Sequence, residues 1–541
     1  MADAQEYAWL PSQIKEAGGV LKTGDIGSNV RRQLLSCQEN PVERESGIVC
    51  TFVVFGASGD LAKKKIYPVL WKLFDHGLLA HCAAIVGYAR SDMTHEQLVE
   101  RIKPYIKVAE GKEAKLAQFL DKCVYFRGTY DKEESFSGLN TYLSKLEKDL
   151  KHQTIRRMFY LALPPSVFEP VTEHIRKQCW SDGINRVIVE KPFGRDSATS
   201  EVLSKHLTGL YDEKDLYRID HYLGKEMVQN LMVVRFANRI LGPLWNRDNI
   251  ACVQITFKEN FGTGGRGGYF DTFGIVRDIL QNHLMQVLTI IAMEKPCSTD
   301  ADDIRDEKVK VMKSIPPIKL EECVLGQYVA NPIEGNPDSE QGYLEDPTVP
   351  NDSKTATFCT CVVHVNNERW QGVPFIMRAG KALDERKAEV RIQFKEVPTN
   401  IFETETIRRN ELVVRIQPNE AIWLNVVNKK PGMKFGVTET FLDLSYGDRF
   451  EDAQMPEAYE RLILDAIQGD QLNFVRSDEL REAWRIFTPM LHERDAGKGE
   501  LINYKYGSRG PAESDQMIAD LGYIRSGRNP SVAPSPLPPK M

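Results

Sequence analysis

The sequence predicts two domains of different fold class: a doubly wound, Rossmann-like α/β domain, followed by a larger β+α domain with a mainly antiparallel sheet. Three observations lead to this prediction. Strands and helices alternate over residues 48–217, the first strand ends in a glycine-containing turn that opens a helix, and serial β-branched segments dominate the second half. Alternation is typical of parallel α/β sheets, whereas serial strands joined by turns are typical of antiparallel sheets.

The first domain is expected over residues 47–217. Residues 48–60, IVCTFVVFGASGD, are a continuous apolar run ending in glycines, as in a buried parallel strand. In the segment that follows, Ile66, Leu70 and Leu73 share one helical face. Further strands are expected in CAAIVGYARS, RRMFYLALPP and NRVIVEKPFG, with the helices HEQLVERIKPYI and VFEPVTEHIRKQCW between them.

The second domain is expected over residues 218–515. Its segments alternate apolar and polar residues or are β-branched, which predicts a largely antiparallel sheet. These segments are NIACVQITFKEN, ATFCTCVVHVNN, AEVRIQFKEV, NELVVRIQP and AIWLNVVNK, and the helices GIVRDILQNHLMQVLTIIAME and PEAYERLILDAIQG interleave with them. Residues 1–46 are expected to form a flexible extension, and the Pro/Ser-rich residues 516–541 a largely disordered tail.

Composition narrows the class of protein. The 541 residues are 42% hydrophobic and 27% charged, as in an ordinary globular protein. A formal net charge of -6 argues against non-specific nucleic-acid binding, which needs a basic surface. No apolar run reaches the roughly 18–20 residues that span a bilayer, and no secretory signal is visible. The 10 cysteines lack zinc-type spacing, which predicts buried free thiols in a reducing compartment and no metal site.

A nucleotide site is expected at the turn Gly56-Ala57-Ser58-Gly59-Asp60-Leu61. The glycines allow a tight turn and close backbone approach, and the helix N-terminus offers N–H groups to a pyrophosphate. The alternative is an ordinary strand-to-helix turn, since two glycines alone are a weak signal. Arg90 follows the second strand where an NAD-binding chain has Asp or Glu, which favours NADP; the alternative is a solvated arginine.

Catalytic residues are expected in the run 218–226, RIDHYLGKE. His221 and Lys225 can hold a phosphate, and Tyr222 can donate a hydrogen bond to it. His283 lies beside the apolar face of its predicted helix, so it is either a satisfied core residue or a general base braced by Asp220. Spacing alone does not show that Asp220 and His283 meet.

Six motifs together resemble the glucose-6-phosphate dehydrogenase family, in the family's order and spacing from about Val49 to Gly510. They are GASGDLAKKKIYP, EKPFGRD, RIDHYLGKE, FGTGGRGGYFD, RDILQNHLMQ and RAGKALDERKAEVR. The resemblance implies oxidation of D-glucose 6-phosphate at C1 to 6-phosphoglucono-1,5-lactone with hydride transfer to NADP+. This is the first step of the oxidative pentose phosphate pathway. It further implies a homodimer or homotetramer in the cytoplasm, with a peroxisome-like organelle left open.

The resemblance also implies roles for individual residues. His283 is the general base, oriented by Asp220. The substrate-binding residues are Lys191, His221, Tyr222, Lys225, Glu259, Asp278, Lys381 and Arg386. The cofactor-binding residues are Gly56, Ser58, Gly59, Asp60, Leu61, Arg90, Tyr160 and Lys191.

Eukaryotic members of that family hold a second, structural NADP, lined by basic residues and by aromatics near the C-terminus. This chain keeps the basic residues Arg378, Lys387, Arg391, Arg415 and Arg509, but Trp423 stands where a Tyr is usual, and no Tyr or Trp follows Tyr523. Base–aromatic stacking is worth roughly 1–3 kcal/mol per ring. We therefore expect this second site to be empty or weaker by about tenfold or more.

Two other functions were weighed. A glucose–fructose-type or inositol-type oxidoreductase shares the first domain and the Glu-Lys-Pro motif, but it lacks RIDHYLGKE and the long second domain. An NADP-sensing protein without catalysis would be expected to have lost Asp220, Lys225 or His283, and all three are present. Comparing the rate of turnover of glucose 6-phosphate with that of free glucose distinguishes these functions.

Overall fold

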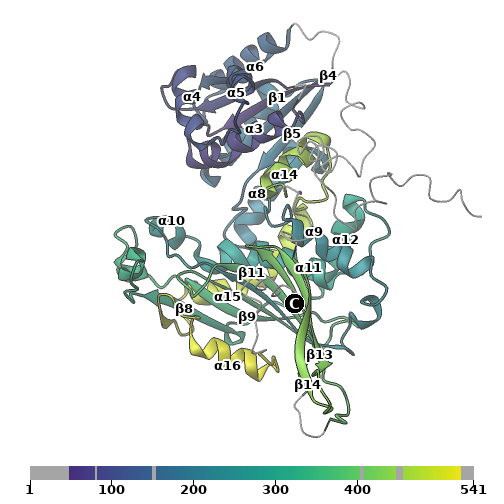
Figure 1. Ribbon diagram of the computed structural model, residues 1–541. Helices are drawn as coiled ribbons and strands as arrows, with labels where there is room; N and C mark the ends of the chain where they lie inside the picture. The colour runs from purple at the N-terminus through teal and green to yellow at the C-terminus, as the bar shows by residue number, and fades with distance from the viewer. Residues whose placement is uncertain (1–47, 80–81, 149–153, 403–406, 446–454, 526–541) are drawn as a thin grey trace, which may run out of the picture.

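The computed structural model describes residues 48–79, 82–148, 154–402, 407–445 and 455–525. Two β-sheets organise these residues, one of six strands and one of nine. The expected extension over residues 1–46 lies outside the described residues. The two-domain α/β plus β+α architecture predicted from the sequence is confirmed (Figure 1).

The first sheet has the strand order β3-β2-β1-β4-β5-β6, and every neighbouring pair is parallel. This order is that of a doubly wound dinucleotide-binding domain. Its strands are β1 (Ile48–Phe55), β2 (Cys82–Ala89), β3 (Cys123–Arg127), β4 (Thr154–Leu161), β5 (Ile184–Val189) and β6 (Leu216–Arg218).

Helices cover both faces of this sheet, because side chains alternate between the faces along each strand. Phe52 and Val54 of β1 pack with one helical layer, and Val53 and Phe55 pack with the other. The first layer contains α3 (Tyr67–Asp75), α4 (His95–Ile102) and α5 (Glu113–Lys122). The second contains α6 (Glu133–Glu147), α7 (Phe168–His174) and α8 (Ser197–Leu210).

The second sheet is mixed and mainly antiparallel, with the order β14-β13-β12-β11-β7-β10-β9-β8-β15. Only the pairs β10–β7 and β15–β8 are parallel among its described strands. The strands are β7 (Ile250–Lys258), β8 (Cys323–Val329), β9 (Phe358–His364), β10 (Pro374–Gly380), β11 (Lys387–Phe394), β12 (Glu411–Gln417), β13 (Ala421–Lys429), β14 (Val437–Ser445) and β15 (Ile502–Lys505).

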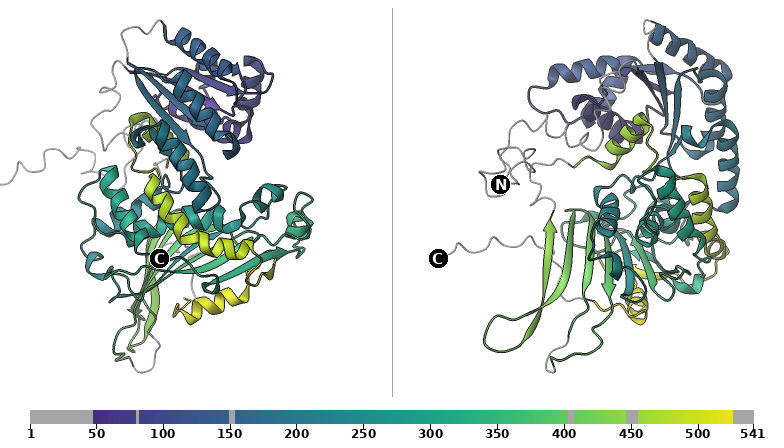
Figure 2. Two further views of the ribbon diagram at one scale, coloured as in Figure 1. Left: turned by 180° about the vertical axis from the view of Figure 1, so that it is seen from behind. Right: turned by 90° about the vertical axis from the view of Figure 1, so that its right-hand side faces the viewer.

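One face of this sheet is covered by several helices, and the other face carries a C-terminal helix (Figures 1 and 2). The first group comprises α9 (Glu226–Phe236), α10 (Gly267–Asp271), α11 (Met285–Ala292), α12 (Ala301–Lys313) and α15 (Ser477–Asp495). The helix α16 (Ala512–Asp520) lies against the opposite face, where Ser514 bonds Thr360 and Asp515 pairs with Arg378.

Shorter helical segments connect these elements. Three are π-helical: η2 (Ala62–Ile66), η6 (Ile175–Cys179) and η9 (Val276–Leu284). The others are the 3₁₀ turns η3 (Lys103–Tyr105), η5 (Pro165–Val167), η7 (Glu213–Asp215), η8 (Gly242–Leu244), η10 (Leu320–Glu322), η11 (Pro337–Glu340) and η12 (Tyr343–Glu345).

The predicted boundary between the domains differs from the structure. The strand β6 extends to Arg218, one residue past the expected end of the first domain. The helix α14 (Ala458–Gln468) then returns to the first domain, where Leu462 and Ile463 join the core of the first helical layer. Arg186 Nη1 of β5 donates to the carbonyl of Ala466 over 2.7 Å. The residues 218–515 are therefore not one spatial unit.

The expected C-terminal tail over 516–541 is also corrected in part. The helix α16 runs across position 516, and its Ile518 is buried. The hydroxyl of Tyr523 donates to Glu411 over 2.9 Å, which fixes the chain to β12. The remaining residues 526–541 lie outside the described residues.

Within the described ranges, no helix combines the length and apolarity needed to cross a bilayer. The described cysteines are all free thiols, and most of them are buried. This agrees with the prediction of buried thiols.

Candidate active site

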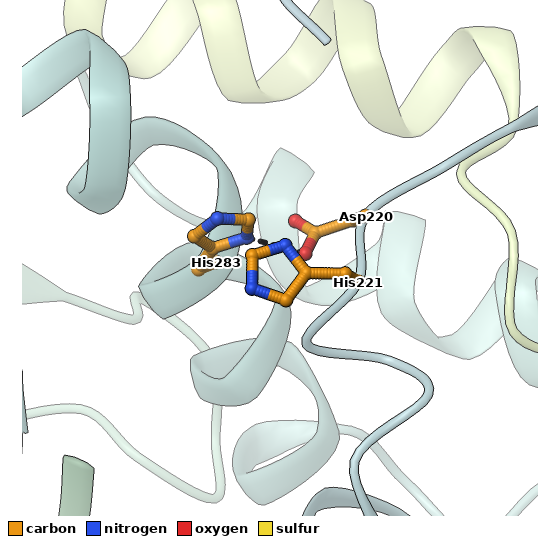
Figure 3. A group of neighbouring side chains, drawn as sticks. All are labelled: Asp220, His221 and His283. Carbon is orange, nitrogen blue, oxygen red and sulfur yellow. Dashed lines mark hydrogen bonds and ion pairs between the residues drawn. The ribbon is translucent and has the colours of Figure 1, made fainter. Parts of the chain in front are cut away.

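The loop after β6 and the helix η9 bring Asp220 and His283 together, although 63 residues separate them in the sequence. His283 Nδ1 lies 2.5 Å from Asp220 Oδ1 (Figure 3). Both side chains are buried. The second imidazole nitrogen, Nε2, lies 3.1 Å from Lys191 Nζ. The contact between Asp220 and His283, which spacing alone did not show, is therefore present.

The π-helical form of η9 explains why Asp278 and His283 face the same site. Five residues correspond to about 1.4 turns of an α-helix, which would point the two side chains in different directions. A π-helix pairs residues five apart along its axis, and such segments recur at functional sites. Asp278 and His283 consequently both contact Lys191.

Lys191 links the first domain to this helix. It follows β5 and precedes Pro192 in a cis peptide bond. Its Nζ donates to Asp278 O over 2.7 Å and to Asp278 Oδ1 over 3.0 Å. Burial by itself lowers the pKa of Lys191, but the Asp278 carboxylate outweighs burial and raises it. Lys191 is therefore a fixed cation between the two domains.

The electrostatic environment keeps the Asp220–His283 pair in the form that a general base requires. Burial raises the pKa of Asp220, but the neighbouring His283 outweighs burial and brings it to about 2. Burial lowers the pKa of His283, and Asp220 offsets this only in part. At neutral pH the pair is therefore a carboxylate and a neutral imidazole. Because the carboxylate accepts from Nδ1, the lone pair is on Nε2.

The residues expected to hold a phosphate surround this pair. The His221 ring lies 4.4 Å from the His283 ring, and the Tyr222 ring stacks on His283 at 4.6 Å. The Tyr222 hydroxyl is buried and has no hydrogen-bond partner among the described residues. Lys225, which caps α9, has a pKa lowered by burial. Arg386 is exposed but close enough to interact electrostatically with Tyr222 and Lys225.

Two further expected residues form an ion pair beside Asp278. Lys381 Nζ lies 2.5 Å from Glu259 Oε2, and Lys381 also packs over the Phe270 ring at 5.0 Å. Burial raises the pKa of Asp278, but the charges of Lys191 and Lys381 outweigh it and bring the pKa to about 2. Lys191 thus joins Asp278 and His283 by hydrogen bonds, and Lys381 acts on Asp278 electrostatically. Lys225 and Arg386 interact with their neighbours at this site through their charges.

The turn after β1 has the close backbone packing expected of a nucleotide-binding turn. Gly56 has φ +79°, and a Cβ added there would lie 2.2 Å from the carbonyl oxygen of Ala162. Gly59 donates to the carbonyl of Gly56 over 2.9 Å, which closes the turn. Ser58 Oγ lies 3.2 Å from Ser91 Oγ, next to the end of β2. Leu61 immediately precedes the helical segment η2.

Two exposed residues among those expected to bind the cofactor, Asp60 and Arg90, contact neighbouring side chains. Asp60 is exposed and pairs with Lys63 at 2.7 Å and Lys64 at 2.8 Å, whose hydrogen bonds lower its pKa to about 2. Arg90 is exposed and packs over the Tyr130 ring at 5.3 Å, with no carboxylate partner among the described residues.

Tyr160 differs from the expectation for a cofactor-contacting side chain. It is fully buried, and its hydroxyl donates to Glu190 Oε1 over 2.5 Å. The side chain therefore does not present its hydroxyl to the nucleotide turn.

Glu190 and Tyr459 belong to the site but were not among the expected residues. Burial raises the pKa of Glu190 to about 7, although hydrogen bonds from Tyr160 and Tyr459 oppose this. The Tyr459 ring stacks on the His221 ring at 5.9 Å with an interplanar angle of 8°. The Glu-Lys-Pro motif could have indicated Glu190, but no local signal marks Tyr459, because α14 reaches the site only through the fold.

Asp220, His221 and His283 also have the spacing of a metal site, with one ligand atom each within 4.8 Å of the others. Two observations weigh against a cation there. His283 Nδ1 already bonds Asp220, and its Nε2 faces the ammonium group of Lys191 at 3.1 Å. A divalent cation would be repelled by that charge.

Comparison with known proteins decides the family. The model of the glucose-6-phosphate dehydrogenase NAD-binding domain matches residues 53–230, and that of the C-terminal domain matches residues 232–524. The chain belongs to the glucose-6-phosphate dehydrogenase family. A dinucleotide-binding domain of this family implies a nicotinamide cofactor.

Individual members of the glucose-6-phosphate dehydrogenase family are similar over nearly the whole chain. Glucose-6-phosphate 1-dehydrogenase of Caenorhabditis elegans is 52% identical, covering 95% of this chain and 99% of that protein. The enzyme of that name from Takifugu rubripes is 57% identical, covering 88% and 90%.

Solved structures agree. A glucose-6-phosphate dehydrogenase in complex with its substrate glucose 6-phosphate is 46% identical, with a TM-score of 0.84 over 88% of this chain and 98% of that one. The Mycobacterium avium glucose-6-phosphate 1-dehydrogenase is 33% identical with a TM-score of 0.76, covering 89% and 100%.

Proposed function

We propose that this family member oxidises D-glucose 6-phosphate at C1 to 6-phosphoglucono-1,5-lactone and reduces NADP+. The observation that carries the proposal is the buried Asp220–His283 pair, whose free Nε2 meets Lys191 at the junction of a dinucleotide-binding domain and a polar pocket. The names of the relatives, including a substrate complex at 46% identity, support the same reaction.

His283 acts as the general base. Its neutral Nε2 removes the proton of the C1 hydroxyl as the C1 hydride leaves, so that the C1–O bond becomes the lactone carbonyl. A bound nicotinamide supplies the hydride acceptor. Asp220 stabilises the imidazolium that forms and keeps Nδ1 protonated, because its carboxylate accepts from that nitrogen. With the substrate bound, Lys191 Nζ donates to a substrate oxygen and no longer to His283 Nε2.

The phosphate group is the handle that selects the substrate. His221, Tyr222 and Lys225 follow one another closely on the loop before α9, and Lys225 lies at the N-terminus of that helix. Backbone N–H groups at a helix N-terminus and a cation both favour an anion. The ion pair of Lys381 with Glu259, together with Asp278, offers donors and acceptors for sugar hydroxyls.

The residues present fit NADP. The turn at Gly56 packs closely against Ala162 and leads into a helical segment, and Arg90 lies at the end of β2 with no carboxylate partner in the described part of the chain. A guanidinium there suits a 2′-phosphate.

Arg90→Asp is expected to shift the ratio of kcat/KM for NADP+ to that for NAD+ toward NAD+. An unchanged ratio would remove Arg90 from the cofactor site.

The test of the proposed function is a reduction assay with glucose 6-phosphate, free glucose and buffer, each with NADP+. We expect turnover with the sugar phosphate and little with glucose. His283→Asn is expected to lower kcat by roughly two to four orders of magnitude with little change in KM. Preference for free glucose would favour the glucose–fructose-type alternative, and nucleotide binding without turnover would favour a non-catalytic sensor.

We also propose that the chain forms a dimer or tetramer in the cytoplasm. The hairpin of β13 and β14 leaves Met433, Phe435 and Leu442 exposed, and a group of exposed apolar side chains is typical of a protein–protein contact. A relative from Arabidopsis thaliana, 52% identical, is named cytoplasmic. Light scattering is expected to give two or four times the chain mass of 61.5 kDa. A chain that stays monomeric would contradict the assembly.

A further inference from the structure

A small cavity lies behind the Asp220–His283 pair. It is enclosed by the loop at Asp220, the helices η9 and α11, and the helix α15, and a water-sized sphere can be centred in about 30 Å³ of it. A single water needs roughly 10–15 Å³ by the same measure. Its lining combines polar side chains, among them Asp220, Gln281 and Gln286, with the apolar side chains of Pro192, Phe193, Ile219, Val475, Leu480, Ala483 and Trp484.

Three buried polar atoms among the lining residues have no hydrogen-bond partner within the described part of the protein. They are Asp220 Oδ2, Gln281 Nε2 and Gln286 Oε1. Each of these side chains is only 3% exposed. A buried polar group without a hydrogen bond destabilises the folded protein, so three such groups around one cavity require a common explanation.

The three atoms match the bonding capacity of one water molecule. Two of them, the carboxylate oxygen of Asp220 and the amide oxygen of Gln286, accept hydrogen bonds. The third, the amide nitrogen of Gln281, donates one. Buried waters typically make about three hydrogen bonds, and water has two donors and two acceptors.

We propose that this cavity binds an ordered water that donates to Asp220 Oδ2 and Gln286 Oε1 and accepts from Gln281 Nε2. This makes Gln281 and Gln286 positioning residues for the Asp220–His283 pair. The inference rests on the proposed function, since it assigns the water a role through His283. Asp220 Oδ1 is held by His283 Nδ1 and by the backbone N–H of Tyr222. The water holds the second oxygen and so fixes the plane of the carboxylate.

A crystal structure of the full chain provides the first test. Density for a water within hydrogen-bonding distance of all three atoms is expected. In Ala483→Val the added methyl groups enter the cavity, so the water is expected to be lost while both glutamines and Asp220 remain. A cavity that is dry in the wild-type protein, or filled by a glutamine side chain that bonds Asp220 directly, would overturn the proposal.

Kinetics provide the second test. For Ala483→Val and Gln286→Leu we expect kcat to fall about three- to tenfold, which corresponds to one hydrogen bond, with KM for the sugar phosphate changed less than about twofold. Ala483→Val displaces the water, and Gln286→Leu removes one of the two acceptors that orient it. In both variants Asp220 Oδ2 loses or weakens its hydrogen bond from the water, which leaves more negative charge facing His283. At acid pH kcat/KM rises as His283 loses its proton, and this part of the pH profile is its acid limb. The midpoint of the acid limb is therefore expected to move to higher pH by about half a unit to one unit.

Gln327→Leu is the matched control. Gln327 is 4% exposed, and its amide nitrogen donates to the carbonyls of Ser353 and Thr355. Its loss should lower thermal stability without moving the acid limb. An unchanged limb in Gln286→Leu, or the same shift in Gln327→Leu, would overturn the positioning role. The proposed function fails separately, if His283→Asn retains near-normal kcat.

Discussion

At the scale of single residues, His283 sets the pH dependence of the reaction. Burial lowers the pKa of this histidine below its ordinary value of 6.5, and Asp220 raises it only in part. The base must be unprotonated, so kcat/KM is expected to rise with pH through a value below 6.5 and to be level at neutral pH. A pH profile of kcat/KM with saturating NADP+ measures this.

Asp220→Asn provides the matched variant. It removes the anion that raises the pKa of His283, so the acid limb should move to still lower pH while kcat falls. An acid limb above 6.5 in the wild-type protein, or an upward shift in the variant, would contradict the assignment of His283 and Asp220.

Lys225 gives a second prediction at this scale. Its ammonium is partly buried at the start of α9 and has no carboxylate in contact among the described residues, which leaves it free for a phosphate. Lys225→Ala should raise KM for glucose 6-phosphate strongly, because a charge-assisted contact is lost. Steady-state kinetics with Lys395→Ala, an exposed lysine just after the end of β11, serve as the control. If the substitution lowered kcat/KM equally for glucose 6-phosphate and for free glucose, Lys225 would have a role other than binding the phosphate.

At the scale of elements, four strands of the first domain, β1, β2, β4 and β5, were predicted, whereas the short strands β3 and β6 were not. Each of the predicted strands of that sheet exists, because a parallel strand covered on both faces must be apolar throughout. In the second sheet, β10 was not predicted, although all its residues are buried. Its Arg378 interrupts the apolar pattern, and its partners, the Asp515 carboxylate and the Arg509 carbonyl, lie far along the chain.

The helix that carries His283 was predicted, but its π-helical first half was not. Apolar spacing does not distinguish an inserted residue in a helix from ordinary variation in pattern. That insertion decides which side chains meet Lys191, so the pairing of Asp278 with His283 required the structure. Tyr459 was missed for a related reason: α14 packs on the first domain through contacts that no local pattern encodes.

The strands β8 and β9 yield a prediction about thiol chemistry. Cys323 pairs directly with Cys361 across the sheet. The Cα atoms of two residues paired in this way lie about 4.5–5.5 Å apart, which is a Cα–Cα distance that a disulfide can bridge. Cys323 is partly exposed, so hydrogen peroxide can reach its sulfur. Hydrogen peroxide is therefore expected to convert the two thiols to a disulfide, with two waters formed per peroxide consumed.

Peptide mass spectrometry of the peroxide-treated protein measures this disulfide as a linked peptide pair that is two hydrogens lighter than the free peptides. Cys323→Ser should abolish the link, and the buried Cys252 should stay reduced in the same samples. Sulfinic acid at Cys323 with no link to Cys361 would contradict the prediction.

At the scale of the whole molecule, segments of the second half of the chain pack on the first domain, although the sequence predicts two consecutive domains. The helix α14 completes the core of the first domain, and Trp484 of α15 donates to the carbonyl of Phe193 over 3.0 Å. Lys191 joins η9 across the same junction. The site residues therefore come from both parts, and the boundary expected near 217 does not separate cofactor groups from substrate groups.

The last prediction concerns a second nucleotide. The basic residues that could line such a site already have carboxylate partners. Arg391 contacts Glu389 at 2.6 Å and Glu411 at 2.8 Å, and Arg415 contacts Glu389 at 3.1 Å. Trp423 packs against both guanidinium groups, at 5.9 and 5.2 Å, so its ring is not free to stack on a base.

The other basic residues of this group are neutralised in the same way, and the final aromatic side chain is engaged. Arg378 and Arg509 share Asp515, Lys387 pairs with Glu385, and the Tyr523 hydroxyl donates to Glu411. A second NADP would have to displace these carboxylates and would gain little stacking.

Titration calorimetry on nucleotide-stripped protein is expected to show one tight NADP site per chain. The rise in melting temperature with NADP should shrink in Arg90→Asp, because stabilisation comes only from the site at β1 and β2. Two tight sites, or stabilisation that survives this substitution unchanged, would contradict the prediction.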